Sequence, residues 1–412
     1  MKVFMTAYAC EPEKGSEPGV GWGWANGLAS HVELTVATRA NNQPVIEKYY
    51  AENPDYPGGT RPEFLYHDPG ALAIWLKKKG ILPTQAFFAL WKLGVMWRFR
   101  KQLGGFDLFH HMTYSSIRLP GLWWFSSKPV VVGPVGGTST VSPNYISFYG
   151  ARAWKEKVRA MMIRSWKWVP WVRLSLGRAD RIVGSNSEAT NMMAELYDDK
   201  VSYLMEIGVD RKDVIAQEAM PSFDRFELVW IGMVEPWKGW IIALKAVARA
   251  KAILGAEKPI RLRMLGRGKD ESAAAAMVAE LGISDEVQLL KRIPLEELNQ
   301  LIITSHAMIF SSVKDTSGTV VLEAMCKGKP LICLNHQGVG DMTTEDTAIR
   351  IEVGPLDETV ENFANAIVTL ARDEALVKRL GEASRERVLS DYVWDEKAKK
   401  MNKIYQQALR SK

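Results

Sequence analysis

The sequence lacks the features that define several protein classes. It has three cysteines in 412 residues, too few for a disulfide framework, and no Cys/His spacing typical of a zinc site. No apolar run approaches the ~18–20 residues of a membrane span. The short apolar run that ends at Ala9 is followed at once by charged residues, unlike a signal peptide. We therefore expect a cytoplasmic protein with reduced cysteines.

Several catalytic signatures are also missing. No Asp-x-Asp occurs, which argues against a diphosphate site clamped by a metal ion of that kind. Gly-x-Ser-x-Gly, His-Glu-x-x-His and a Cys/His nucleophile pair are absent as well. No metal or other cofactor is expected.

The length and the pattern of the chain indicate two domains. At roughly 100–200 residues per domain, 412 residues suit two. Strand and helix patterns alternate nearly throughout, which is typical of parallel sheets wrapped by helices. A break near 208–225 divides two such series. We expect an α/β protein with two doubly wound, Rossmann-like domains, 1–208 and 209–390, that face a central cleft, and a helix over 391–412 that returns to the first domain.

The expected strands divide between the two halves. In the first half they are Lys2–Ala9, Val32–Arg39, Glu63–His67, Asp107–His111, Pro129–Gly133, Arg181–Gly184 and Val201–Glu206. In the second half they are Phe226–Gly232, Ile260–Leu265, Val287–Leu290, Ala307–Phe310, Pro330–Leu334 and Ala348–Glu352. Helices are expected over Val20–Ser30 and Thr84–Gln102, near Lys238, Asp270, Leu295 and Gly318, and in one long tail from Asp357 to Lys412.

The net positive charge is confined to the first half. The net charge of +6 lies within residues 1–210, mostly in two stretches, 71–105 and 151–178, which also hold seven of the fifteen tryptophans. Basic residues mixed with Trp suit a surface that faces anionic headgroups. Solvated helices whose Trp side chains point inward fit the pattern equally well, and both interpretations stay open. Nucleic-acid binding is not favoured, because no reader motif is present.

The most informative stretch follows the strand Ala307–Phe310. Gly318 permits a tight turn there, and the free amides of the helix that it opens form an anion site. Asp315 precedes the turn and Glu323 lies one to two helical turns later, so that two carboxylates flank the amides. This arrangement suits a sugar, a diphosphate and a ribose. An ordinary strand–turn–helix with Asp315 as a cap is the alternative.

Two further glycine loops follow strands of the second half. Gly232 and Met233 end the first of these strands, and Lys238 begins the next helix, from which it can reach phosphate oxygens. Gly266, Arg267 and Gly268 follow the next strand, although Gly-x-Gly alone is weak evidence.

The first half has comparable junctions. Gly15 and Ser16 begin a stretch of small residues that links the first strand to the first helix and lets backbone amides approach a ligand. His110 and His111 end a strand and could serve an acceptor hydroxyl or a phosphate. A paired His at a strand end is more often structural.

Taken together, these stretches resemble the family-4 retaining glycosyltransferases of the GT-B fold over almost the whole chain. Asp315 to Glu323 resembles that family's Glu, seven residues, Glu motif. The segment from Ile231 to Gly239 resembles its phosphate-binding segment. The opening from Cys10 to Trp22 resembles a branch found in bacterial surface-polysaccharide synthesis.

The resemblance implies roles for single residues. Glu323 would bind the donor ribose, Lys238 the diphosphate, and Asp315 the hydroxyls of the transferred sugar. Gly15 and Ser16 would close on the donor from the first domain. The expected catalytic residues are Asp315, Lys238, His110 and His111. The remaining expected donor-binding residues are Gly232, Met233, Gly266, Arg267, Arg292, Thr316, Ser317, Gly318 and Thr319.

The chain departs from the family pattern at three places, one of which is that His110-His111-Met112 lacks the second His of the family's His-x-His pattern. Asp315 is one methylene shorter than the usual Glu, and Met233 stands where a phosphate-binding Arg is usual. The expected function is transfer of a sugar from a nucleotide-diphosphate sugar, with retention of configuration, to a saccharide or lipid-linked acceptor. The alternative is a catalytically impaired partner that binds the donor or scaffolds an active transferase. A peripheral contact with anionic membrane is expected only under the first interpretation of the basic stretches.

Overall fold

The computed structural model describes residues 1–54, 60–114, 116–121, 123, 126–214 and 221–411. They form two compact units. The first consists of residues 1–138, 163–210 and 393–412, and the second of residues 139–162 and 211–392. Each unit has its own parallel sheet, and each is described by itself below.

The first unit is built on a seven-stranded parallel sheet in the order β3-β2-β1-β4-β5-β6-β7. Apolar residues on both faces of β1 and β5 are buried, as expected of strands covered by helices on both sides. The strands are β1 (Lys2–Thr6), β2 (Glu33–Arg39), β3 (Glu63–His67), β4 (Leu108–His111), β5 (Val130–Val135), β6 (Arg181–Gly184) and β7 (Val201–Tyr203).

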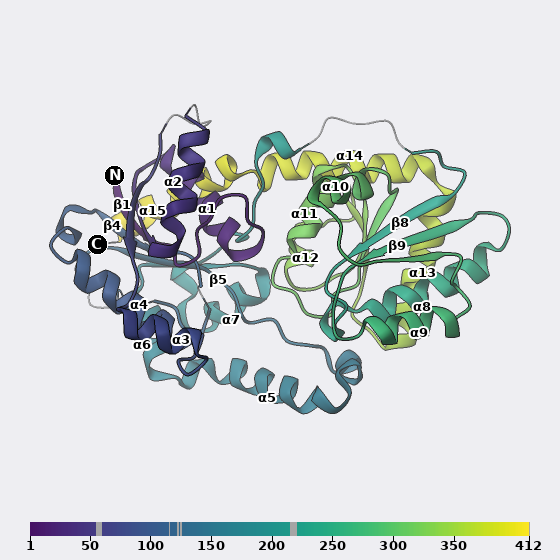
Figure 1. Cartoon of the computed structure of the whole chain (residues 1–412), viewed down its shortest axis with the longest axis horizontal. Coiled ribbons are helices and arrows are strands. Elements are labelled where there is room, and N and C mark those ends of the chain that lie inside the picture. Colours follow the sequence, from purple (N-terminus) through teal and green to yellow (C-terminus); the bar gives the residue numbers. More distant parts are fainter. Residues whose placement is uncertain (55–59, 115, 122, 124–125, 215–220, 412) are drawn as a thin grey trace. The chain divides into compact units, whose positions relative to one another are not determined.

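Helices cover both faces of this sheet (Figure 1). The C-terminal helix packs against the first helix of the chain, and Tyr405 from it is fully buried in the same cluster as Val3 and Trp24. The helices are α1 (Ser16–Ala29), α2 (Gln43–Glu52), α3 (Ala71–Lys78), α4 (Thr84–Phe99), α6 (Pro170–Arg178), α7 (Ser187–Tyr197) and α15 (Trp394–Arg410). The predicted return of the C-terminal helix to the first unit is confirmed.

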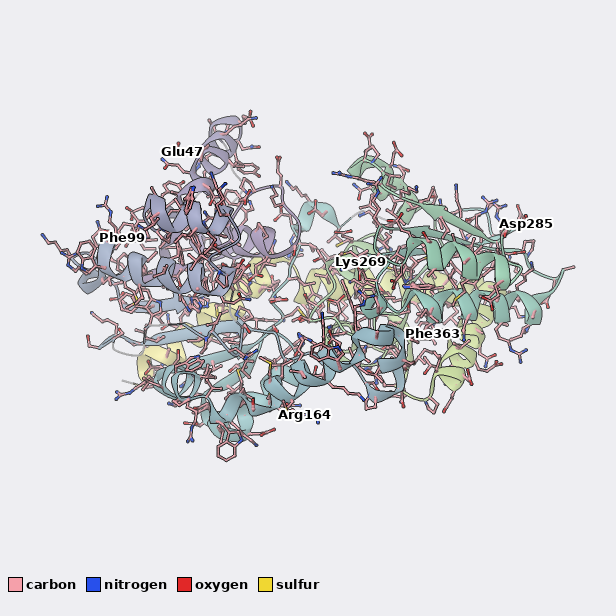
Figure 2. All side chains as sticks on the ribbon, turned by 60° about the horizontal axis from the view of Figure 1, so that its bottom comes forward. Glu47, Phe99, Arg164, Lys269, Asp285 and Phe363 are labelled. Carbon is pink, nitrogen blue, oxygen red and sulfur yellow. The ribbon has the colours of Figure 1, made fainter. Side chains whose placement is uncertain are left out.

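The second unit is built on a six-stranded parallel sheet in the order β10-β9-β8-β11-β12-β13. Its core joins the sheet to α8 and α13, and Phe363 of α13, labelled in Figure 2, is fully buried there. The strands are β8 (Phe226–Ile231), β9 (Ile260–Leu265), β10 (Val287–Leu290), β11 (Ala307–Phe310), β12 (Leu331–Leu334) and β13 (Ala348–Ile351).

The helices of the second unit lie on both sides of its sheet. In Figure 1, α8, α9 and α13 lie together on one side, and α10 and α11 lie on the other. The helices are α8 (Trp240–Leu254), α9 (Glu271–Glu280), α10 (Leu295–Ile303), α11 (Thr319–Cys326), α12 (Gln337–Met342), α13 (Leu356–Arg372) and α14 (Glu374–Asp391). The unit also contains the 3-10 segment η4 (Pro143–Arg152) and the first residues of α5 (Ala153–Arg164).

The structure differs from the sequence predictions in three places. Residues 139–162 belong to the second unit, not to a domain spanning 1–208, because Tyr145 is fully buried in the second unit's core. The predicted single tail consists of α13, α14 and α15, which are separated at Asp373 and at 392–393. The first helix begins at Ser16 instead of Val20, so the predicted glycine loop is partly helical.

The described helices and the three cysteines have properties that bear on membrane spanning and on thiol reactivity. None of the described helices is both long and apolar enough to cross a bilayer. The three cysteines are buried and free. Burial in apolar surroundings raises the pKa of the Cys333 thiol to about 11, so this thiol remains protonated and unreactive near neutral pH.

Candidate active site

Two tight turns, one at Gly239 and the other at Gly318, bring the predicted site residues of the second unit together. One connects β8 to α8 through the 3-10 segment η8 (Pro236–Lys238) and Gly239. Gly239 has a positive φ of 64°, and a Cβ atom there would lie 1.9 Å from the carbonyl oxygen of Ser311, which follows β11. Only glycine allows this approach. The turn therefore holds Lys238 against the loop that carries Asp315.

Lys238 and Asp315 form a close ion pair. The Lys238 Nζ atom lies 2.5 Å from Asp315 Oδ2, and the two side chains are 18% and 21% exposed. The ammonium group also lies 5.5 Å from the centre of the Phe310 ring. The pair is partly shielded from water, where a lysine charge interacts more strongly with an anionic ligand than at a fully exposed surface.

The loop between β11 and α11 is held by α12. The backbone amide of Asp315 donates to Gln337 Oε1 at 2.7 Å, and Gly338 packs against the backbone of Thr316 and Ser317. Gly318 has a φ of 74° and caps α11, which leaves the first amides of that helix, from Thr319 onward, at the turn. The predicted anion site and its neighbouring carboxylate are thus part of one braced loop.

Glu323 lies within α11, five residues after its cap. Its side chain is half-buried, and burial raises the pKa of its carboxyl group, while the nearby Lys327 lowers it. No hydrogen bond to its carboxylate is formed within the described part of the chain. Glu323 is therefore a partly desolvated acceptor on the same helix whose N-terminus follows Asp315.

The other predicted donor residues stand at the ends of neighbouring strands. The amide of Gly232 donates to the Leu265 carbonyl at 3.0 Å, and that of Gly266 to the Leu290 carbonyl at 2.9 Å. These glycines therefore bind the loops to one another. Met233, Arg267 and Arg292 are exposed beside them.

The two histidines of the first unit are core residues. His110 is fully buried, with Nδ1 2.5 Å from the Tyr405 hydroxyl and Nε2 2.7 Å from the Gly133 carbonyl oxygen. His111 is 1% exposed, and its Nδ1 lies 2.9 Å from Thr6 Oγ1. Burial lowers the pKa of His110 to about 4. We correct the predicted catalytic role: both rings are neutral structural groups, without access to a ligand.

The predicted first-unit loop is only partly available to a ligand. Gly15 is exposed and caps α1, and Ser16 has an unusual positive φ of 59°. Glu17 accepts a hydrogen bond from the Tyr114 amide, and burial raises the pKa of its carboxyl group. The open backbone at Gly15 and Ser16 is compatible with the predicted approach of amides to a ligand.

A pocket next to Asp315 was not predicted from the sequence. It measures about 450 Å³ and is lined by Ser139, Tyr149, Arg152, Lys155, Glu156, Arg159, Pro236, Trp237, Lys314, Asp315 and Thr316. All of these residues belong to the second unit. The basic stretch 151–178 was the available signal, but it indicated a surface and not a pocket wall. Its partner Lys314 lies 162 positions after Arg152 and 155 after Arg159, too far in the sequence for their contact to be predicted.

The second unit matches a known family. Residues 214–387 fit the family model of glycosyl transferases group 1. These residues include Lys238, Asp315 and Glu323. The match with this family lies within the second unit, and the fold of the chain, with two Rossmann-like parallel sheets, is that of GT-B glycosyltransferases.

Relatives of known name agree with this family. The chain is 24% identical over 208 residues, 50% of its length and 48% of the relative, to MMP alpha-(1->4)-mannosyltransferase of Mycolicibacterium hassiacum. It is 30% identical over 165 residues, 40% of its length and 42% of the relative, to N-acetyl-alpha-D-glucosaminyl L-malate synthase of Bacillus anthracis. The matches thus span about half the length of these curated relatives or less.

Solved structures resemble the chain over both units. Sucrose-phosphate synthase from Thermosynechococcus elongatus has a TM-score of 0.62 at 16% identity and is covered over 100% of both chains. Anabaena HepE, solved with UDP and glucose, has a TM-score of 0.61 at 13% identity, with 98% of this chain and 99% of that chain covered. At these identities the likeness concerns the fold.

Proposed function

We propose that the protein transfers a sugar from a nucleotide-diphosphate sugar to a saccharide or lipid-linked acceptor, with retention of anomeric configuration. The observation that carries this proposal is the Lys238–Asp315 ion pair, which lies just before the N-terminus of α11, together with Glu323 within that helix. The group includes a cation, an anion-binding helix end and two carboxylates that accept hydrogen bonds from hydroxyls.

Each part of a donor has a matching group. The diphosphate lies on the first amides of α11 and replaces Asp315 as the partner of Lys238. Glu323 accepts hydrogen bonds from the ribose, and the released Asp315 accepts hydrogen bonds from the transferred sugar. Because Met233 lacks a charge, Lys238 and the helix amides carry most of the stabilisation of the diphosphate, with the exposed Arg267 nearby.

The proposed reaction takes place on one face of the sugar. The bond between the anomeric carbon and the diphosphate oxygen breaks, and the acceptor hydroxyl oxygen bonds to the same carbon from the same face. The hydroxyl proton passes to the departing diphosphate, which takes both electrons of the broken bond. The protein positions the two substrates and stabilises the leaving charge. In this proposal Lys238 and amides, rather than a metal ion, neutralise the diphosphate.

A panel of UDP-, GDP- and dTDP-sugars tests the proposal. One donor, at about a hundred times its dissociation constant, should stabilise the protein by about 2.7 kcal/mol, a rise of several degrees in Tm. Transfer or hydrolysis of that donor should then be detectable, also with a chelator present. Binding without turnover would favour the alternative of a non-catalytic partner, which the uncharged Met233 supports. No binding by any donor would contradict both.

We also propose that the first unit contacts anionic membrane. Of the seven tryptophans in the basic stretches, Trp91 and Trp166 are buried, whereas Trp97 and Trp168 are 70% and 74% exposed. Trp75 and Trp171 of the first unit are exposed as well, and so is Trp154, which belongs to the second unit. An inward orientation therefore holds for only two of the seven. Exposed Trp beside Lys and Arg is the composition that binds at headgroup level.

Three helices of the first unit carry much of this surface. α3 and α4 pack together, and the buried faces of α4 and α6 join one apolar cluster. Figure 1 shows the three helices close to one another. Their outer residues include Trp75, Leu93, Trp97, Trp171 and Leu174, all exposed. Apolar side chains at such positions, with cations between them, support a peripheral contact.

Vesicle sedimentation tests the membrane proposal. The wild type should bind anionic vesicles at low salt and ignore zwitterionic ones. Binding should be lost when four exposed cations in or just after α3 and α4 are replaced by Gln: Lys78, Lys79, Arg98 and Lys101. A control that replaces four exposed cations of the second unit, Lys269, Lys291, Lys378 and Arg379, should retain binding. Equal loss in both variants would indicate nonspecific attraction instead.

A further inference from the structure

The pocket beside Asp315 has a wall from a distant part of the sequence. Residues 139–162 contribute Ser139, Tyr149 and the cations Arg152, Lys155 and Arg159 to it, and the loop before α11 contributes Lys314. This wall is anchored to the second unit. The Tyr145 hydroxyl lies 2.9 Å from Thr359 Oγ1, and Gln337 Nε2 donates to the Thr140 carbonyl at 2.8 Å. Gln337 thereby links the wall to Asp315, because its Oε1 atom accepts a hydrogen bond from the Asp315 backbone amide.

The pocket has an excess of positive charge. Its four cations face two carboxylates in the lining, and one of these, Asp315, is already paired with Lys238. The other, Glu156, lies 2.8 Å from Lys314 Nζ and 3.7 Å from Arg159. Arg152 lies 3.7 Å or more from its acidic neighbours Glu235 and Asp270, beyond hydrogen-bond distance, and Lys155 is exposed. Arg152 forms two long ion pairs with these carboxylates but donates no hydrogen bond to them, so Arg152 and Lys155 both keep hydrogen-bond donors for an anion.

Two hydroxyl groups in the wall have unused hydrogen-bonding capacity. Ser139 and Tyr149 are 3% and 6% exposed, and neither hydroxyl has a hydrogen-bond partner among the described residues. An unsatisfied buried hydroxyl costs free energy that a bound polar ligand can recover. Burial and the neighbouring Glu156 raise the pKa of Tyr149, which keeps its hydroxyl neutral and able to donate.

The position of the pocket separates it from the expected donor site. It reaches Asp315 and Thr316, but Glu323, Gly318 and Thr319 are not in its lining. Under the proposed function, Asp315 marks the transferred sugar, whereas Glu323 marks the ribose at the other end of the donor. The pocket therefore begins where the transferred sugar lies and extends away from the nucleotide, where an acceptor must approach.

We propose that this pocket binds the acceptor, and that the acceptor carries a phosphate group held by Arg152, Lys155 and the hydroxyls of Ser139 and Tyr149. The inference rests on the proposed function for the role of Asp315. A volume of about 450 Å³ suits a group of the size of a sugar phosphate. Arginine and lysine together with hydroxyl donors are the groups that recognise phosphate.

Calorimetry on the full chain tests this assignment with two probes, glucose 6-phosphate for a soluble sugar phosphate and decyl phosphate for a lipid-like one. Glucose is the uncharged control, and UDP reports on the donor site. The Arg152→Gln/Lys155→Gln variant removes the two available cations. The matched control, Lys157→Gln/Arg164→Gln, removes two exposed cations of α5 that do not line the pocket.

The wild type should bind at least one of the phosphate probes and not glucose. Its Kd should rise about tenfold or more in the pocket variant and less than about twofold in the control, with the Kd of UDP unchanged in both. Which probe binds identifies the source of the phosphate. Binding of neither probe, or an equal loss of UDP affinity in the pocket variant, would overturn the inference. Phosphate binding without binding of UDP, GDP or dTDP would instead refute the donor site and leave this anion site standing.

Discussion

The two units share one architecture but use the ends of their strands differently. In the first unit, β4 ends in His110 and His111, whose rings are buried and bonded to Tyr405, Gly133 and Thr6. In the second unit, β8 and β11 lead to Lys238 and Asp315, which remain partly exposed. Parallel sheets present their carboxyl ends as ligand sites in general. Here the second unit keeps its two polar residues partly exposed, whereas the first buries its two histidines, one of them against Tyr405 of the C-terminal helix.

The difference teaches that polar residues at a strand end are not by themselves a site. The two cases differ in the residue that each polar side chain contacts. The helix α15 supplies Tyr405, whose hydroxyl contacts the His110 ring. The turn at Gly239 instead holds Lys238 against Asp315, just before the N-terminus of α11. Variants that alter either partner test this contrast.

The largest effect is expected from Lys238→Ala. Charge on the leaving diphosphate grows as the glycosidic bond breaks, so the loss of one stabilising cation should lower kcat by about 10²–10³. Steady-state kinetics with the donor identified by thermal shift measures it. Lys238→Arg should restore part of the rate, and Lys245→Ala in α8, the helix that follows the turn, should change little. If the variant also showed a fall of many degrees in Tm, the loss of rate would be explained by unfolding, and Lys238 would have a structural role instead.

The next effect concerns the stability of the first unit at acid pH. The pKa of His110 is about 4 in the folded chain and 6.5 ordinarily, mainly because of burial. As pH falls below 6.5 the unfolded chain takes up this proton first, so stability present above pH 6.5 is lost towards pH 4. The loss from pH 7 to pH 5 should be about 2 kcal/mol for this group.

Urea unfolding at several pH values measures that loss. The His110→Gln variant is less stable at pH 7 but should show a shallower decline with acid. Its donor turnover per folded molecule should equal that of the wild type, since the ring has no access to a ligand. A large loss of turnover in a folded variant would restore the catalytic assignment.

A smaller effect is expected from Glu323→Gln, which replaces a charged hydrogen-bond acceptor by a neutral amide. Such bonds contribute about 1.5–3 kcal/mol, so donor affinity should fall about tenfold or more. Burial raises the pKa of this carboxyl group, so wild-type affinity should decline on acidification at a higher pH than an exposed Glu would give. Calorimetry at two pH values checks both, and an unchanged Kd would place the ribose elsewhere.

The smallest effect is expected from Met233→Arg. Met233 is 52% exposed near the turn that carries Lys238. If Lys238 and the amides of α11 already neutralise the diphosphate, an added cation at this exposed site should change kcat by less than about tenfold, because screening by water weakens its charge. A larger gain would indicate that the natural protein is catalytically impaired.

Much of the fold could be predicted because local patterns agree with it. The strands β3, β6, β9, β10 and β11 have the predicted bounds, since short apolar runs flanked by turn residues leave little choice of register. The turn at Gly318 and the helix after it follow from the same local signals. The Asp315–Glu323 spacing, which places both carboxylates beside one helix end, was likewise visible in the sequence.

What the sequence did not reveal depends on contacts between distant residues. The buried state of His110 requires Tyr405, 295 positions away, and the ion pair of Lys238 requires Asp315, 77 positions away. Residues 139–162 read as part of the first half, yet their packing on the second unit forms the pocket with Lys314. Periodicity reports which face of an element is apolar, but not which element covers it. Burial and charge pairing depend on that second choice, and so only the folded chain decided which polar residues are core and which remain open to a ligand.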